Sequence, residues 1–149
     1  MKKIFAPCFL LTSLLLLLLS SCSKSDDNAG SSFTWNYKGV SYTALYTRVS
    51  SIEDLGPNIR AGIDNSAMAP GSGPSFKIIP LTTGLYAVGP GENYAGFVDT
   101  EGFNLPVAGI LQITSVSNKK LSATFTLEVG PAGNQHTLTG IIKNVPITP

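Results

Sequence analysis

Glycine and proline interrupt this chain so often that long helices have almost no room to form. All fifteen glycines and nine of the ten prolines lie in residues 22–149. In that part of the chain, the two longest stretches free of both residue types are Val40–Leu55 and Ile110–Val129. The second stretch alternates apolar and polar residues, which is the period of a half-buried strand and not of a helix. The sequence therefore predicts an all-β protein.

The aromatic segment 33–44 predicts a β-hairpin with a specified register. Lys38-Gly39 has the length of a tight two-residue turn between two segments of alternating residues. This turn would place three pairs on the core face: Phe33 with Ala44, Trp35 with Tyr42, and Tyr37 with Val40. The polar residues between them would lie on the outer face: Thr34, Asn36, Ser41 and Thr43. A one-residue slip would destroy this agreement.

The C-terminal third predicts three strands that pair in chain order. Apolar and polar residues alternate without error over 121–129. A three-residue turn, Asn118–Lys120, would join this strand to one over 109–117. The resulting pairs would be Ile113 with Phe125 and Leu111 with Leu127 inside, and Thr114 with Thr124 outside. A last strand over 136–145 would place Leu138 opposite Leu127, and Gly140 opposite Phe125, whose ring would cover the glycine.

The remaining segments complete a single domain over residues 33–149, which is large enough for a hydrophobic core. Four further short strands are expected over 58–63, 75–79, 84–88 and 94–98, with a loop over 69–74. Ser50–Leu55 predicts a single helical turn with a serine cap. Together these segments favour an antiparallel β-sandwich of about eight short strands, with a flattened β-barrel as the alternative.

The N-terminal residues are typical of a secretory leader. Lys2 and Lys3 precede an apolar run, Ile4–Leu19, that is shorter than the ~20 residues of a membrane-spanning helix. The run ends in Leu19-Ser20-Ser21-Cys22, which resembles the bacterial lipobox. The resemblance implies that residues 1–21 are a lipoprotein signal peptide and that lipid on Cys22 anchors the protein in a membrane. A transmembrane anchor and an ordinary secretory signal are the alternatives.

Residues 22–32 are polar and predict a flexible tether. Ser23–Asp27 also resembles the acidic export signal of many Bacteroidota lipoproteins, which implies the outer membrane, with the cell surface favoured over a periplasm-facing position. Without Lys2 and Lys3, eight basic residues face nine acidic ones. No basic patch is evident in the sequence, which argues against nucleic-acid binding.

Several short motifs are distributed along the domain. In chain order they are Phe33…Gly39…Tyr42-Thr43-Ala44, Gly84-Leu85-Tyr86, Gly109-Ile110-Leu111-Gln112-Ile113, Leu121–Phe125 and Thr139-Gly140. This pattern resembles a family of small Bacteroidota lipoproteins with an uncharacterised all-β domain. The chain departs from the family at two places. Family members often have glycine at the position of Ala123 and an aromatic residue at the position of Ile141 or Ile142. The resemblance implies architecture and location only, because the family carries no established activity.

Few residues are candidates for chemistry. His136, the only histidine, is expected opposite Val129 at the rim of the sheet, and not against a serine in a cleft. The oxygens of Asp99, Glu101 and Asn104 lack the spacing of a calcium loop, which favours solvated loop residues. The glycine-rich segments 71–73 and 89–91 lack phosphate-loop patterns and predict turns. We therefore expect a protein that is not an enzyme and that has no catalytic residue, metal site or cofactor.

Aromatic side chains give the best case for binding. Four of them are suited to stacking on sugar rings: Trp35, Tyr37, Tyr42 and Tyr46. The hairpin register, however, points the first three of these toward the core. Tyr86 and Tyr94 remain as candidate rim contacts. The sequence thus predicts a non-catalytic binding or accessory module of the cell envelope, with a glycan or a protein as its partner. An inhibitor or immunity-type lipoprotein that binds a protein partner is the alternative, and a small hydrolase is the third.

Overall fold

The computed structural model describes residues 30–51, 56–63, 72–91, 93–101, 104–105 and 107–149. These ranges contain eleven strands and no helix, and hence no helix long and apolar enough to cross a membrane. The strands are β1 (Ser32–Tyr37), β2 (Val40–Thr43), β3 (Tyr46–Ser50), β4 (Ile59–Gly62), β5 (Gly73–Lys77), β6 (Gly84–Val88), β7 (Tyr94–Val98), β8 (Asn104–Leu105), β9 (Val107–Ser117), β10 (Lys120–Val129) and β11 (His136–Thr148). The all-β prediction is confirmed, with eleven strands in place of about eight.

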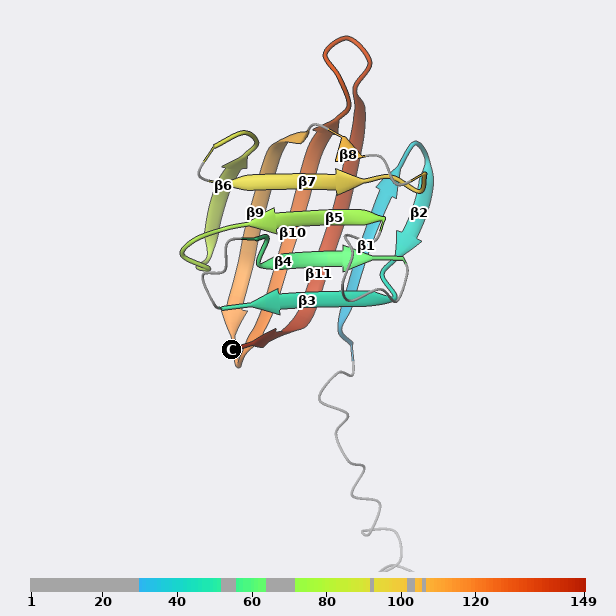
Figure 1. Ribbon diagram of the computed structural model, residues 1–149. Coiled ribbons are helices and arrows are strands. Elements are labelled where there is room, and N and C mark those ends of the chain that lie inside the picture. Colours follow the sequence, from blue (N-terminus) through green and yellow to red (C-terminus); the bar gives the residue numbers. More distant parts are fainter. Residues whose placement is uncertain (1–29, 52–55, 64–71, 92, 102–103, 106) are drawn as a thin grey trace, which may run out of the picture.

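The strands form two layers that cross each other (Figure 1). Sheet A has the order β2-β1-β11-β10-β9-β6, and sheet B has the order β3-β4-β5-β7-β8. The last residues of β11 join the two layers, because Ile147 and Thr148 pair in parallel with Val49 and Ser50 of β3. The result is a nearly closed, barrel-like sheet. It has the two facing layers of a sandwich and the continuity of a flattened barrel.

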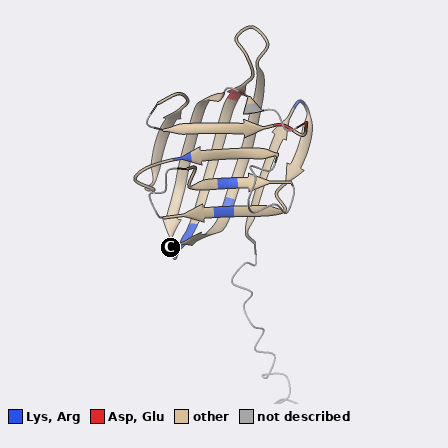
Figure 2. Cartoon of the chain, in the orientation of Figure 1, with Lys and Arg blue, Asp and Glu red and all other residues tan. Residues whose placement is uncertain are grey.

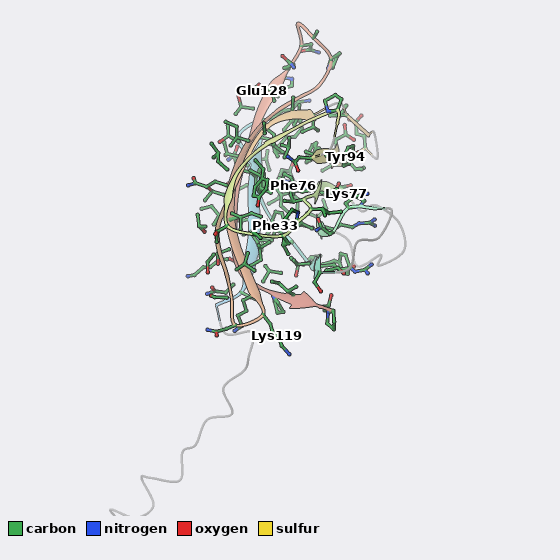
Figure 3. The ribbon with its side chains drawn as sticks, turned by 90° about the vertical axis from the view of Figure 1, so that its left-hand side faces the viewer. Phe33, Phe76, Lys77, Tyr94, Lys119 and Glu128 are labelled. Carbon is green, nitrogen blue, oxygen red and sulfur yellow. The ribbon has the colours of Figure 1, made fainter. Side chains whose placement is uncertain are left out.

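The core lies between the inner faces of the two sheets. Phe125 of sheet A has its ring centroid 5.2 Å from that of Phe76 in sheet B and 5.9 Å from that of Phe33. Phe33 and Phe76 are both fully buried and lie between the layers in Figure 3. Edge-to-face aromatic packing of this kind adds to the stabilisation from apolar burial. This cluster therefore fastens one layer to the other.

The first hairpin has the predicted register. Tyr37 pairs with Val40 and Trp35 pairs with Tyr42. Lys38 and Gly39 both have positive φ angles, 51° and 76°, as the two central residues of a type I′ turn require. One part of the prediction is wrong: Val40 is 52% exposed, although its partner Tyr37 is buried, because β2 is the outermost strand of sheet A and pairs only with β1.

The predicted pairing of β9 with β10 is wrong by two residues. The turn has two residues, Asn118 and Lys119, whose φ angles are 51° and 56°, and the strand resumes at Lys120. A bulge then shifts the register between Ser122 and Ala123. The observed pairs are therefore Ala123 with Ile113, Phe125 with Leu111, Thr124 with Gln112 and Leu127 with Gly109. The pairing with β11 is as predicted, with Leu127 opposite Leu138 and Phe125 opposite Gly140.

Three local predictions need correction or fall outside the described residues. Tyr46–Ser50 forms strand β3, so Ser50 ends a strand and does not begin a helical turn, while residues 52–55 lie outside the described ranges. Strand β5 begins at Gly73, inside the loop that was expected over 69–74. The last three strands of sheet A are also long, at 11, 10 and 13 residues.

Asn58 is a buried polar residue that the sequence does not single out. It is 7% exposed and precedes β4. Its Nδ2 donates to the carbonyl oxygen of Ile78 (2.8 Å), and its Oδ1 accepts from the amide of Ile78 (3.0 Å). One side chain thereby satisfies both backbone groups of a fully buried residue where β5 has ended.

Candidate functional site

The aromatic residues of the first hairpin belong mainly to the core. Trp35 and Tyr37 are 4% and 6% exposed. Trp35 stacks on Tyr42 with a centroid distance of 5.6 Å, and Tyr37 packs against Phe97 at 4.8 Å. Rings that pack against each other in this way present little free face to a sugar. The sequence interpretation of Trp35, Tyr37 and Tyr42 as core residues is confirmed for the first two, and Tyr42 is half-buried against the same cluster.

His136 lies where the register predicts it, opposite Val129 at the start of β11. It is half-buried, and its ring lies edge-on to Tyr37 with a centroid distance of 6.0 Å. Within the described ranges, no three His, Cys, Asp or Glu side chains are grouped so that they could hold a metal ion. The contacts of His136 are thus those of an aromatic side chain at the rim of the core.

The acidic segment after β7 forms a local turn. Asp99 Oδ1 accepts a hydrogen bond from the backbone amide of Glu101 at 3.0 Å, a pattern in which an aspartate caps its own turn. Asn104 begins β8. Of the two glycine-rich segments, Gly73 lies within β5 and Gly89 donates its amide to the Asn93 carbonyl at 3.0 Å. Gly71 lies outside the described residues.

The two tyrosine candidates lie in different sheets. Tyr86 is opposite Leu111, on the inner face of sheet A, and packs against the core. Its hydroxyl donates to the Thr82 carbonyl and also contacts Thr82 Oγ1, both at 2.8 Å. Tyr94 is 38% exposed on sheet B, and its hydroxyl lies over Gly96, 2.6 Å from where a Cβ at that position would be. Tyr94 therefore has the more accessible ring.

A ligand-sized depression lies on the outer face of sheet A and has a volume of about 520 Å³. It spans four neighbouring strands, β2, β1, β11 and β10. The side chains that line it from the outer face are short and uncharged: Thr34, Asn36, Ser41, Thr43, Thr124, Thr139 and Ile141. Ligand pockets commonly have volumes of about 300–1,000 Å³ with a few convergent polar groups. We call the hollow that these seven side chains line the hydroxyl-lined depression.

The strand register places these side chains in two rows. Thr34 lies between Thr43 and Ile141, and Thr124 lies beyond Ile141. The second row contains Ser41, Asn36 and Thr139 in adjacent strands. Because neighbouring strands are about 4.8 Å apart, polar groups of adjacent strands lie close together in both rows, and Ile141 is the one apolar side chain in the first row.

Most hydroxyl groups of this depression are free to bind a ligand. Asn36 Nδ2 donates to Ser41 Oγ at 3.3 Å. Within the described part of the chain, the hydroxyls of Thr34, Thr43, Thr124 and Thr139 have no side-chain hydrogen bond. A hydroxyl can both donate and accept. The depression can therefore hold a ligand that itself carries donors and acceptors and no net charge.

The sequence alone does not indicate this site. Its alternation predicts outer faces for Thr34, Asn36, Ser41, Thr43 and Thr124, as observed, but it does not show that the first hairpin pairs with the C-terminal strands. That junction is the pairing of β1 with β11, in which Thr34 lies opposite Ile141.

Comparisons with protein-family models, with curated proteins and with solved structures gave no match.

Proposed function

We propose that this chain is a lipid-anchored, non-catalytic binding module of the bacterial outer membrane, displayed at the cell surface, and that its ligand is a neutral glycan. The leader and the lipobox-like Leu19–Cys22 support the anchor. One observation supports the binding role above all others. It is the hydroxyl-lined depression, in which free hydroxyls converge from four strands without any charged side chain.

A glycan fits the chemistry of this depression. Sugar hydroxyls donate and accept hydrogen bonds, as threonine hydroxyls do. An uncharged lining imposes no cost for desolvating a charge when the ligand displaces water. Ile141, which is 54% exposed, adds an apolar surface between two threonines for the C–H face of a sugar ring.

A protein partner is the second candidate, and exposed apolar residues of β6 and β9 favour it. Leu85 is 68% exposed and Ile110 is 47% exposed on the outer face of sheet A. Ala87, which is also exposed, lies opposite Ile110 and joins it to Leu85 in a small apolar group. Gln112 and Thr126 border this group, so it consists of three side chains, whereas protein-binding patches have a larger contiguous apolar centre. The glycan remains the favoured ligand.

Removing two free hydroxyls should weaken glycan binding. We expect the Thr124→Val, Thr139→Val double variant to bind about tenfold more weakly, since each hydrogen bond contributes about 0.5–1.5 kcal/mol. Valine keeps the volume and the strand preference of threonine. Isothermal titration calorimetry of the mature lipoprotein against a panel of soluble neutral polysaccharides measures the effect.

Thr126→Val is the matched control, because Thr126 is exposed on the same strand and does not line the depression. Its affinity should equal that of the wild type. Equal affinity for the double variant, or no binding of any neutral polysaccharide, would contradict the assignment of this site.

The anchor makes a separate prediction. Cys22→Ala should abolish incorporation of a labelled fatty acid and leave the precursor uncleaved, because the lipid attaches to the Cys22 sulfur and cleavage follows it. Cys8→Ala, the change at the only other cysteine, should leave both steps intact. Mass spectrometry of the wild-type protein from the membrane fraction decides the question: a mature chain without acyl groups would refute the anchor.

A further inference from the structure

The only two arginines of the chain lie directly opposite each other on adjacent strands. Arg48 of β3 pairs with Arg60 of β4 on the outer face of sheet B. Side chains at directly opposed positions have Cβ atoms about 4.5–5.5 Å apart, and like charges there are destabilising. The two arginines are twelve positions apart in the chain, which is why the sequence alone shows no basic patch.

A third basic residue completes the group. Lys77 of β5 lies diagonally across from Arg60, because Ser75 is the residue opposite Arg60. Basic positions on β3, β4 and β5 gather across sheet B in Figure 2, whereas the acidic positions that the structure describes lie toward the upper edge of the molecule. Lys77 lies on the side of sheet B away from Phe33 in Figure 3. The group therefore faces outward.

No described carboxylate neutralises these charges. Arg60 donates from Nε to the Pro57 carbonyl oxygen at 3.2 Å, and neither Arg48 nor Lys77 forms an ion pair within the described ranges. Glu53, Asp54 and Asp64 precede or follow β4 in the sequence and lie outside the described residues. Two directly opposed arginines and a lysine on neighbouring strands give this face several cationic donors, which suit an anion.

A groove adjoins this group. Arg48 and Tyr46 line an open cavity of about 380 Å³ between β3 and the end of β11, together with Ser31. Such a cavity has room for a small anionic group beside Arg48. Ser31 is also where the domain meets the tether, so the groove lies at the end of the domain that is nearest the anchor.

We propose that Arg48, Arg60 and Lys77 form a binding site for a phosphate group, distinct from the hydroxyl-lined depression of sheet A. Guanidinium groups match phosphate oxygens with paired hydrogen bonds, and lysine adds a point charge. The phosphate has two candidate sources, a lipid headgroup or a free phosphate. The tether favours the headgroup, since the nine residue steps from Cys22 to Ser31 reach at most about 30 Å. This choice of source rests on the proposed acylation of Cys22, whereas the phosphate site does not.

The test uses the mature lipoprotein in neutral detergent micelles and follows the two arginine Nε–Hε signals by NMR. Inorganic phosphate is titrated in one arm, with acetate and chloride at equal ionic strength as controls. Micelles doped with phosphatidylglycerol or with phosphatidylcholine form the second arm. We expect both signals to shift together and saturably with phosphate and not with acetate. If phosphatidylglycerol shifts the signals at a lower concentration of phosphate groups than inorganic phosphate does, the lipid headgroup is the source. If only inorganic phosphate shifts them, free phosphate is the source.

Arg48→Gln should lower the phosphate affinity about tenfold, because it removes charge-assisted hydrogen bonds. Its melting temperature should equal or exceed that of the wild type, since it relieves the repulsion with Arg60. Lys143→Gln, a change at an exposed basic residue of β11, should change neither. The proposal is overturned if phosphate leaves the arginine signals unmoved, if acetate or chloride shifts them equally, or if Lys143→Gln weakens binding as much. It is also overturned if Glu53→Gln or Asp54→Asn shifts the Arg48 signal without ligand, because the arginines would then pair with the chain's own carboxylates.

Discussion

Replacement of Phe125 by alanine is expected to lower the free energy of unfolding by about 3–5 kcal/mol. Phe125 is 3% exposed, and its ring contacts one aromatic residue from each layer, Phe33 and Phe76. The same ring covers Gly140 on β11, where a Cβ would overlap it. The substitution therefore opens a cavity at the point where the two layers meet, and the glycine beneath it cannot fill that cavity.

Thr124→Ala is the matched control for this prediction. Thr124 precedes Phe125 in the same strand and is exposed on the outer face, so its change should alter the free energy of unfolding by no more than about 0.5 kcal/mol. Urea denaturation followed by circular dichroism measures both values. Equal denaturation midpoints for the two variants would contradict the inward orientation of Phe125.

Asn58→Ala should lower the free energy of unfolding by about 2–4 kcal/mol, although it removes no large apolar side chain, as Phe125→Ala does. The alanine would leave the amide and the carbonyl of Ile78 without their hydrogen-bond partner. Each buried backbone group without a partner costs about 1–3 kcal/mol. The expected loss exceeds that of most substitutions at polar residues.

Asn134→Ala provides the comparison for Asn58. Asn134 is exposed in the turn between β10 and β11, and its change should be neutral within about 0.5 kcal/mol. Thermal unfolding monitored by calorimetry separates the two variants. A melting temperature for Asn58→Ala within one degree of the Asn134→Ala value would show that water or a rearranged backbone satisfies Ile78.

The sequence predicts which side chains of a strand face the core much better than it predicts their cross-strand partners. Alternation over 121–129 requires the inward residues of β10 to pair with the inward residues of β9, and the predicted three-residue turn achieves this pairing. The protein achieves it with a two-residue turn followed by a bulge. At the bulge, the Thr114 hydroxyl donates to the Ser122 carbonyl at 3.0 Å. Both solutions keep Leu111, Ile113 and Phe125 inside. Alternation alone cannot distinguish them, because its period is two.

Strand β3 shows a second limit of the pattern. Among Tyr46–Ser50, the inward positions are Thr47 and Val49, and only Val49 is buried and apolar. The alternation is therefore too weak to indicate a strand. Pairing with β4 on one side and with the end of β11 on the other keeps this segment extended. Such long-range pairing leaves no local signal in the sequence.

The same limit explains why both proposed sites were missed. The residues of the hydroxyl-lined depression come from two hairpins at opposite ends of the domain, and the pairing of Thr34 with Ile141 brings them together. The pairing of β4 with β3 and β5 likewise brings together three isolated basic residues, Arg48, Arg60 and Lys77. Each residue looks like an ordinary solvated side chain in its own segment. Only the strand order shows which of them are neighbours.

The most direct test of the binding function is a map of the ligand-contacting surface. Backbone amide shifts of the mature lipoprotein, recorded by NMR during titration with the best-bound neutral oligosaccharide, identify the residues next to the ligand. We expect the largest saturable shifts at Thr34, Thr43, Thr124 and Thr139. Shifts confined to the surroundings of Tyr86 or Tyr94, with the hydroxyl-lined depression unchanged, would contradict the proposed binding site.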